Sequence, residues 1–217
     1  MARYFILIFS LVVLSSCKSN DKRKVSVKSS HQSTSNNRST RGSIYDSSVV
    51  LFGDTAYQLH LHIFKMEMYD ETKPNATLTL KCNRNGVQKV VLVDSLYCMQ
   101  PDIDFKDFNN DGIKDLLIFN YIGGRANPTY HLYLVNNRKH VLEKVKGFEQ
   151  LPNPELDSAS NIITSVALAG MDNLYAFYRI NKKNKLINLG HSFKENPRDT
   201  DQFNRVIKKI KKENRVD

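Results

Sequence analysis

The segment from Asp107 to Asp115 constrains this chain more than any other, because it places oxygen-bearing side chains at fixed intervals around a glycine. It reads D-x-N-x-D-G-x-x-D, and its predicted calcium ligands are Asp107, Asn109, Asp111, Asp115 and the backbone carbonyl of Ile113. Ca²⁺ prefers six to eight oxygen ligands, and a glycine at position six permits the sharp bend of such a loop. The pattern predicts a structural calcium site. A polar hairpin turn rich in Asp, Asn and Gly is the alternative.

The flanks of this loop indicate which kind of calcium loop it is. An EF-hand needs a Glu at position 12 followed by a helix, whereas Ile118 stands at that position. The stretch Ile103–Phe105 alternates like a strand, and Leu116–Phe119 is a short apolar run typical of a buried strand. We therefore expect a strand, a loop and a second strand.

The body around the loop predicts an all-β domain of about nine or ten short antiparallel strands. Tyr57–Phe64 alternates apolar and polar residues with period two, and Asn85-Gly86 between two strand-like runs is a strong hairpin signal. His60 and His62 share one face of the first of these strands. A solvated strand face is favoured over a metal site there, because the sequence shows no third ligand.

The C-terminal segment predicts an amphipathic helix that follows Thr200-Asp201. Apolar residues recur there at helical spacing, at Phe203, Val206, Ile207 and Ile210, and a cluster of lysines follows. The sequence leaves two partners open for this helix: the sheet of its own domain, or a membrane surface.

The first 17 residues predict a bacterial lipoprotein signal peptide. The apolar run Phe5–Leu14 is too short to span a bilayer and ends in Leu14-Ser15-Ser16-Cys17. This ending resembles the bacterial lipobox, which implies that Cys17 carries the lipid anchor; an ordinary signal peptide is the alternative. The expected location is the bacterial cell envelope, with the periplasmic side favoured over the cell surface. Which membrane holds the anchor stays open.

Residues 18–44 predict a flexible basic tether, which leaves residues 45–217 as a single domain with its C-terminal helix. Of the formal net charge of +10, the tether carries +6, the leader +1 and residues 201–217 +3. Residues 45–200 are therefore neutral overall, which argues against a nucleic-acid partner, since such a domain carries its basic patch on the fold. The tether either lies near anionic headgroups or is a solvated spacer.

Two further cysteines, Cys82 and Cys98, remain in the body. An exported protein can oxidise such a pair, so a disulfide and two buried thiols are both open.

Residues 100–192 together resemble a family of exported bacterial proteins, some of them lipoproteins, with a single FG-GAP/VCBS-like calcium loop. The resemblance rests on the loop and on these later segments: Gly123-Gly124, Asn127–Tyr130, Leu151–Pro154, Ile163–Ser165 and Tyr178–Leu186. It implies a partial-propeller-like β fold. One branch resembles immunity proteins that inhibit lysozyme-type peptidoglycan hydrolases delivered by rival cells. No inhibitory residue carries over to this chain.

The sequence favours a binding protein over an enzyme. It contains no G-x-S-x-G or H-E-x-x-H motif, so we predict no catalytic residue. The expected function is a lipid-anchored, calcium-stabilised, non-catalytic envelope protein. Its expected partners are the membrane, through Cys17, and a secreted peptidoglycan hydrolase that it inhibits. A carbohydrate- or peptidoglycan-binding lipoprotein is the alternative, ranked lower because the chain has ten Tyr but no Trp. A hydrolase with an unfamiliar site is the third hypothesis.

Overall fold

The computed structural model describes residues 45–65 and 73–213, all of which belong to one compact unit, Thr40–Asp217. The predicted signal peptide, the lipidation site Cys17 and the tether at 18–44 lie outside the described residues. The described residues form twelve strands, one short 3-10 helix and one α-helix. The all-β class with a C-terminal helix is confirmed, with more strands than the nine or ten expected.

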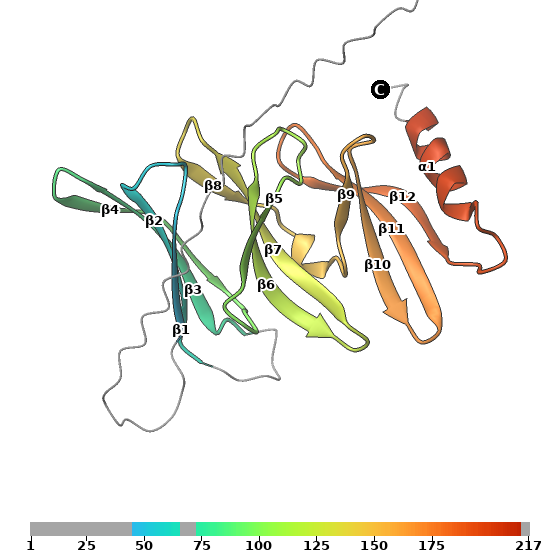
Figure 1. The fold of residues 1–217 in the computed structure, drawn as a ribbon, viewed down its shortest axis with the longest axis horizontal. Helices are drawn as coiled ribbons and strands as arrows, with labels where there is room; N and C mark the ends of the chain where they lie inside the picture. The colour runs from blue at the N-terminus through green and yellow to red at the C-terminus, as the bar shows by residue number, and fades with distance from the viewer. Residues whose placement is uncertain (1–44, 66–72, 214–217) are drawn as a thin grey trace, which may run out of the picture. The chain divides into compact units, whose positions relative to one another are not determined.

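The strands form three four-stranded antiparallel sheets that follow one another along the chain (Figure 1). The first sheet contains β1 (Tyr45–Val50), β2 (Tyr57–Ile63), β3 (Ala76–Arg84) and β4 (Val87–Leu96). The second contains β5 (Ile103–Lys106), β6 (Asp115–Gly123), β7 (Asn127–Asn136) and β8 (Val141–Lys144). The third contains β9 (Glu155–Asp157), β10 (Ile162–Ala169), β11 (Asp172–Ile180) and β12 (Leu186–Lys194). The 3-10 helix η1 (Phe148–Gln150) lies between the second and third sheets in sequence.

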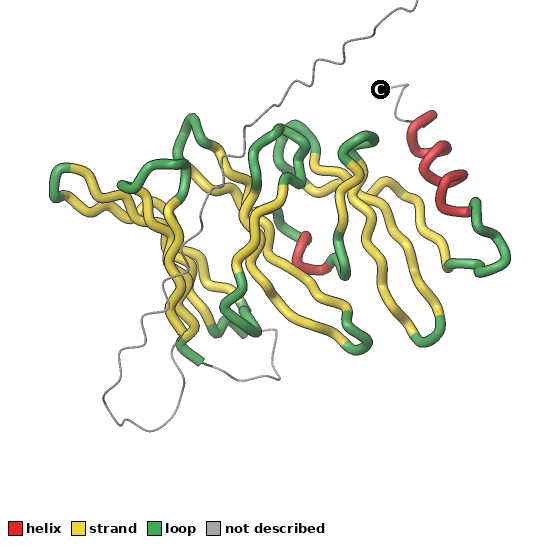
Figure 2. Tube along the Cα trace, viewed as in Figure 1, coloured by secondary structure: helices red, strands yellow, loops and turns green. Residues whose placement is uncertain are grey.

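Within each sheet, strands that are neighbours in sequence are also paired neighbours in the sheet. Each loop therefore connects two adjacent antiparallel strands (Figure 2). The β3–β4 hairpin shows why. Asn85 and Gly86 both have positive φ, 54° and 77°, which a two-residue hairpin of this type requires and which Asn and Gly tolerate best. The hairpin predicted from Asn-Gly is confirmed.

The first sheet buries one face, as the period-two pattern of β2 predicts. Leu59, Leu61 and Ile63 are fully buried, while His60 and His62 between them are half-buried on the other face. These buried residues belong to a first hydrophobic core between the first and second sheets. The second sheet contributes Leu116 and Ile118 of β6 to this core.

The second sheet is buried on both faces. Leu117, which lies between Leu116 and Ile118, points to the opposite side and joins a second core with Phe148 of η1 and Ile163 of the third sheet. Because β6 lies between two cores, its sequence is a continuous apolar run instead of an alternating one. Burying each of these large side chains stabilises the fold by roughly 1.5–3 kcal/mol.

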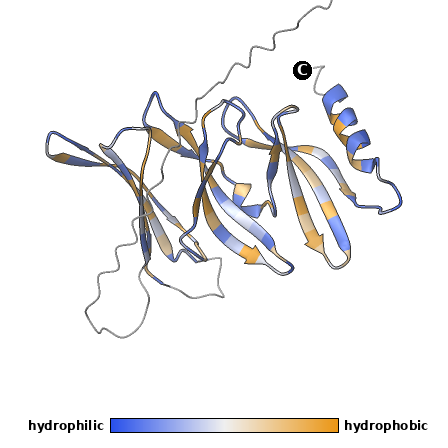
Figure 3. Ribbon diagram, in the orientation of Figure 1, coloured by the Kyte–Doolittle hydropathy of each residue, from blue (hydrophilic) through white to orange (hydrophobic). Residues whose placement is uncertain are grey.

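The helix α1 (Gln202–Glu213) covers the outer face of the third sheet. Ile210 is 1% exposed and packs in a third core with Phe177 and Ile162, with Val206 and Ile207 at its margin. The rest of α1 is mainly hydrophilic (Figure 3). The apolar face of α1 therefore docks on the domain's own sheet, which was one of the two partners that the sequence left open. Within residues 45–65 and 73–213, no helix has the length and apolar character needed to cross a membrane.

Candidate functional site

The predicted calcium segment connects β5 to β6. These two strands pair antiparallel, and Lys106 at the end of β5 lies opposite Asp115 at the start of β6. The segment between them is a closed loop at the end of a hairpin, so the expected order of strand, loop and strand is confirmed. The structure brings Asp107, Asn109, Asp111 and Ile113 into this one loop, with Asp115 at its base.

Asp107 organises the backbone of the loop. Its carboxylate oxygens accept hydrogen bonds from the N–H of Asn110, at 2.7 Å, and from the N–H of Gly112, at 2.8 Å. Gly112 has a φ of 82°, in the left-handed region where a Cβ would be strained. The glycine at position six is therefore required by the bend, as the sequence indicated.

The side chains of Asn109 and Asp111 also bind the backbone of the loop, each at the residue two positions later. The amide oxygen of Asn109 accepts the N–H of Asp111 at 3.2 Å, and Asp111 accepts the N–H of Ile113 at 2.8 Å. The side chain of Ile113 packs against the first core. Its side chain thus anchors the loop.

Asp115 is the one fully buried carboxylate among the described residues. One oxygen accepts the N–H of Phe108 at 2.9 Å, and the other accepts the N–H of Val135, on β7, at 3.1 Å. Burial, with a smaller contribution from the charges of Asp111 and Asp107, raises the pKa of Asp115 to about 6, although the two hydrogen bonds act to lower it. A cation in the loop would oppose that repulsion and favour the ionised form.

The donor chemistry of the loop fits a hard cation, since carboxylate, amide and carbonyl oxygens are the ligands that Ca²⁺ takes. The carboxylate side chains of the loop are not gathered around one point. Within the described ranges, no three His, Cys, Asp or Glu side chains are grouped so that they could hold a metal ion. The fit therefore rests on the kind and order of donors along the loop, and on the like charge gathered around Asp115.

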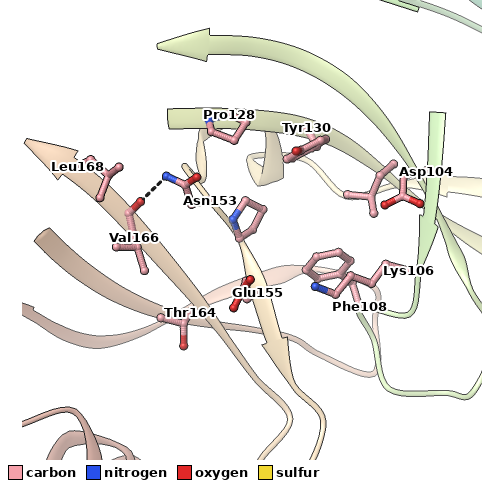
Figure 4. A pocket seen from close by; sticks show the side chains of 12 residues that line it. Asp104, Lys106, Phe108, Pro128, Tyr130, Asn153, Glu155, Thr164, Val166 and Leu168 are labelled. Carbon is pink, nitrogen blue, oxygen red and sulfur yellow. Dashed lines mark hydrogen bonds between the residues drawn. The ribbon is translucent and has the colours of Figure 1, made fainter. Parts of the chain in front are cut away.

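A groove of about 460 Å³ lies beside the loop, between the second and third sheets (Figure 4). Asp104, Lys106 and Tyr130 line it from the second sheet, and Thr164 and Val166 line it from the third. Phe108, the second residue of the loop, also lines the groove and packs in the second core. The loop and the groove therefore share a wall.

The groove combines an aromatic wall with charged residues. Tyr130 is half-buried, and burial, followed by the charges of Asp102 and Asp104, raises the pKa of its hydroxyl group. Glu155 adds a carboxylate, and Lys106 is the cation that lines the groove. Such a surface can bind a ligand through ring contacts together with hydrogen bonds or ion pairs.

Two asparagines hold one end of the groove together. The amide oxygen of Asn127 accepts hydrogen bonds from the N–H of Leu168, at 2.8 Å, and from Nδ2 of Asn153, at 3.0 Å. Nδ2 of Asn153 also donates to the carbonyl of Val166 at 2.8 Å. These bonds link β7 to β10 through the loop that crosses between the sheets. The sequence flagged both asparagines through the family resemblance but gave no reason for them.

The other residues singled out in the sequence lie apart from this site. His62 Nδ1 pairs with Asp46 Oδ1 at 2.6 Å on the outer face of the first sheet. The disulfide that was open for Cys82 and Cys98 is not formed, and both thiols are free. Cys82 lies near the turn of the β3–β4 hairpin, whereas Cys98 bonds to Asn75 at the other end of that hairpin.

Sequence reasoning missed the groove. Its lining comes from five strands that are far apart along the chain, and no spacing rule connects Tyr130 with Thr164. The one signal was the stretch Phe148–Glu155, whose two prolines predict a loop that crosses a face of the domain. Asn153 and Pro154 in this stretch do line the groove, whereas Phe148–Gln150 forms the 3-10 helix η1.

The comparisons with known proteins add one distant likeness. No protein-family model matches the chain, and no curated protein sequence matches it. Among solved structures, the chain is similar to a Xanthomonas protein described as related to a type IV secretion system. The two share 14% identity with a TM-score of 0.41, over 74% of this chain and 91% of the other. A likeness at this level carries no argument about function.

Proposed function

We propose that this chain is a lipid-anchored, calcium-stabilised, non-catalytic binding protein of the bacterial cell envelope that inhibits a secreted peptidoglycan hydrolase. The observation that carries the proposal is the wall shared by the loop and the groove. Phe108 lies between Asp107 and Asn109 in the loop, packs in the second core and lines the groove. A loop held by calcium would therefore hold one wall of a binding surface.

In this proposal the calcium ion is structural. Oxygens of Asp107, Asn109, Asp111 and Asp115 and the carbonyl of Ile113 would hold it, and its charge would offset the repulsion among the carboxylates. The protein's own contribution is the frame of backbone hydrogen bonds that Asp107 and Asp115 accept. That frame fixes the entry into β6 and the position of Phe108.

We infer that the three successive four-stranded antiparallel sheets correspond to blades of a partial propeller, as the resemblance implied. The proposed anchor is Cys17 and the proposed tether is residues 18–44, on the periplasmic side of a membrane. An envelope protein placed there can meet a hydrolase that arrives from outside.

The test is inhibition of peptidoglycan hydrolysis. We would mix the full chain with a lysozyme-type hydrolase and follow the clearing of a peptidoglycan suspension, in calcium and in EDTA. We expect inhibition in calcium, weaker inhibition in EDTA, and inhibition weakened about tenfold or more in a Tyr130→Ala variant, because this ring lines the groove. Lys139→Ala, in the exposed β7–β8 turn, is the matched control and should inhibit like the wild type.

Two outcomes would contradict this function. One is the absence of any inhibition by a correctly folded chain across several lysozyme-type hydrolases. The other is turnover: cleavage of cell-wall fragments by the chain itself, lost in a point variant outside the loop, would make it an enzyme.

The second candidate function is binding of carbohydrate or peptidoglycan. The observation that favours it is the groove, which is lined by the half-buried Tyr130 and by the carboxylates of Asp104 and Glu155. Aromatic rings with neighbouring polar groups suit sugar rings, which have both apolar and hydroxyl faces. A pull-down with purified sacculi separates the two, because a hydrolase inhibitor needs the enzyme and does not need the polymer.

A further inference from the structure

The helix α1 has two faces that differ in chemistry. Val206 and Ile210 lie one turn apart on the face that packs against the third sheet. Lys208 and Lys212 each follow one of these residues by two positions, which is about 200° around a helix axis. The two lysines therefore point away from the sheet, and both are exposed. Because the apolar face is fixed on the domain, the outward direction of the basic face is fixed as well.

The basic face is wider than two residues. Lys209 and Lys211 flank its centre, and both are exposed. We call Lys208, Lys209, Lys211 and Lys212 the lysine face. It contains no acidic residue, and the helix ends in Glu213, which lies near the docked side and pairs with His191 at 2.7 Å.

The acidic residues near α1 have partners of their own. Arg205 Nη1 binds Asp199 Oδ1 at 2.9 Å and lies 3.8 Å from Asp201 Oδ2, so both acids at the start of the helix have a cationic partner. Lys211 lies close enough to Asp157 to contribute, after the Ser160 hydroxyl and the N–H of Ala159, to the lowered pKa of that carboxyl. None of the ion pairs within residues 45–65 and 73–213 includes Lys208, Lys209 or Lys212.

We infer that the lysine face binds an anionic lipid surface, so that the domain rests on its membrane through α1. Charge complementarity carries this inference: several unpaired ammonium groups lie on one face of a rigidly docked helix. The inference rests on the proposed lipid anchor, which keeps the domain within reach of such a surface. Since the apolar face of α1 is buried against the sheet, the contact is electrostatic and does not insert into the bilayer.

The test uses the full chain, carrying its own anchor, reconstituted into two kinds of vesicle. One is phosphatidylcholine alone, and the other contains about 30% phosphatidylglycerol, which makes the surface anionic. A lysine-specific protease is added, and cleavage rates after Lys209 and Lys211 are measured by mass spectrometry relative to Lys139 in the exposed β7–β8 turn. We expect the relative cleavage rate in α1 to be lower on the anionic vesicles than on phosphatidylcholine by a factor of about five or more. At about 1 M salt, where the Debye length is about 3 Å, this protection should disappear.

Two matched variants assign the effect to the face. The double variant Lys208→Gln, Lys212→Gln removes the centre of the lysine face and keeps both reporting sites, and it should lose the protection. Lys89→Gln with Lys146→Gln removes the same charge from two exposed positions, one on β4 and one in the turn between β8 and η1, and should keep the protection. Unchanged melting temperatures would show that α1 stays docked in both.

Equal cleavage of Lys209 and Lys211 on the two vesicles overturns the inference, and so does protection that survives in Lys208→Gln, Lys212→Gln. The proposed lipid anchor is tested by separate measurements. Acylation of Cys17, seen in the mass of its peptide, and flotation with phosphatidylcholine vesicles test the proposed localisation. Neither depends on the lysine face.

Discussion

The carboxyl group of Asp115 obtains its properties from the fold. In the sequence it is the ninth position of a calcium pattern, like any acid that ends such a loop. In the structure it is fully buried and accepts one N–H from the loop and one from β7, so it joins the loop to the neighbouring strand. Asp107 has a different structural role. Both hydrogen bonds that its carboxylate accepts come from N–H groups within the loop.

This difference predicts how loop variants behave. In calcium at about a hundred times its dissociation constant, wild type should gain about 2.7 kcal/mol in the free energy of unfolding over EDTA. Asp107→Ala should abolish that gain and also destabilise the EDTA form by about 1–3 kcal/mol, because two backbone N–H groups lose their acceptor. Thermal melting with and without calcium measures both effects.

Asp104→Ala is the control for this series, since its carboxylate is exposed and binds the N–H of its own neighbour Phe105. It should keep the full calcium response. A wild-type melting temperature that is the same in calcium and EDTA would remove the calcium site from the proposal.

The two thiols also differ by their surroundings. Cys98 is fully buried, and this burial raises its pKa to about 12, against a hydrogen bond to the carbonyl of Gln100. Cys82 is half-buried near the end of its hairpin. Because the thiolate is the reactive form, Cys82 should react with an alkylating reagent at neutral pH well before Cys98.

Mass spectrometry of the native chain after timed alkylation checks this order. In denaturant without reductant, both cysteines should react at once. A protein that takes up no label in denaturant until a reductant is added would have the disulfide that the structure lacks.

Elements of different sheets meet through polar as well as apolar contacts. Asp94 on β4 accepts a hydrogen bond from the hydroxyl of Tyr133 on β7, at 2.6 Å, and pairs with Lys144 on β8 at 2.8 Å. Partial burial, the largest influence, raises the pKa of Asp94, but the bonds to Lys144 and Tyr133 together bring it below the usual 3.8. This cluster joins the first sheet to the second.

A lowered pKa in the folded state makes the contribution of Asp94 depend on pH in one direction. The stabilisation is fully present above the unfolded pKa, near 3.8, and is lost as the pH falls through the lower folded value. Asp94→Asn should therefore lower the free energy of unfolding by about 1–3 kcal/mol at neutral pH. The difference from wild type should shrink below about pH 4.

Urea unfolding of both proteins between neutral pH and acid measures that difference. Tyr133→Phe removes one of the two bonds and keeps the ring in the first core, so it should show a smaller effect of the same sign. A difference that stays constant down to acid pH would show that the carboxylate charge of Asp94 contributes nothing.

Across residues 45–65 and 73–213, each core is shared by consecutive parts of the chain. The first core joins the first and second sheets, the second core joins the second and third, and the third core joins the third sheet to α1. No sheet completes a core from its own strands. Loss of one partner therefore exposes apolar surface on the next, which favours cooperative unfolding of the whole domain.

Ile210→Ala tests this cooperativity at its C-terminal end. The side chain is 1% exposed in the third core, so its removal should cost about 2–5 kcal/mol of global stability. Helical circular dichroism and near-ultraviolet tyrosine signals should then melt together, at a lower temperature than in wild type. Lys209→Ala, on the outward face, is the control and should leave the melting temperature nearly unchanged. Early loss of the helical signal alone would mean that α1 is an independent appendage.

The sequence by itself determined what depends on neighbouring residues. The glycine bend of the loop, the Asn-Gly hairpin, the alternation of β2 and the apolar face of α1 follow from local backbone and side-chain geometry, and each was predicted. Contacts between distant segments were decided only in the tertiary structure. Nothing in their spacing says that Asp94 meets Tyr133 and Lys144, that Asn127 meets Asn153, or that Cys82 and Cys98 lie at opposite ends of one hairpin. The order in which the three sheets pack brings these residues together or apart, and it also forms the groove and leaves the lysine face outward.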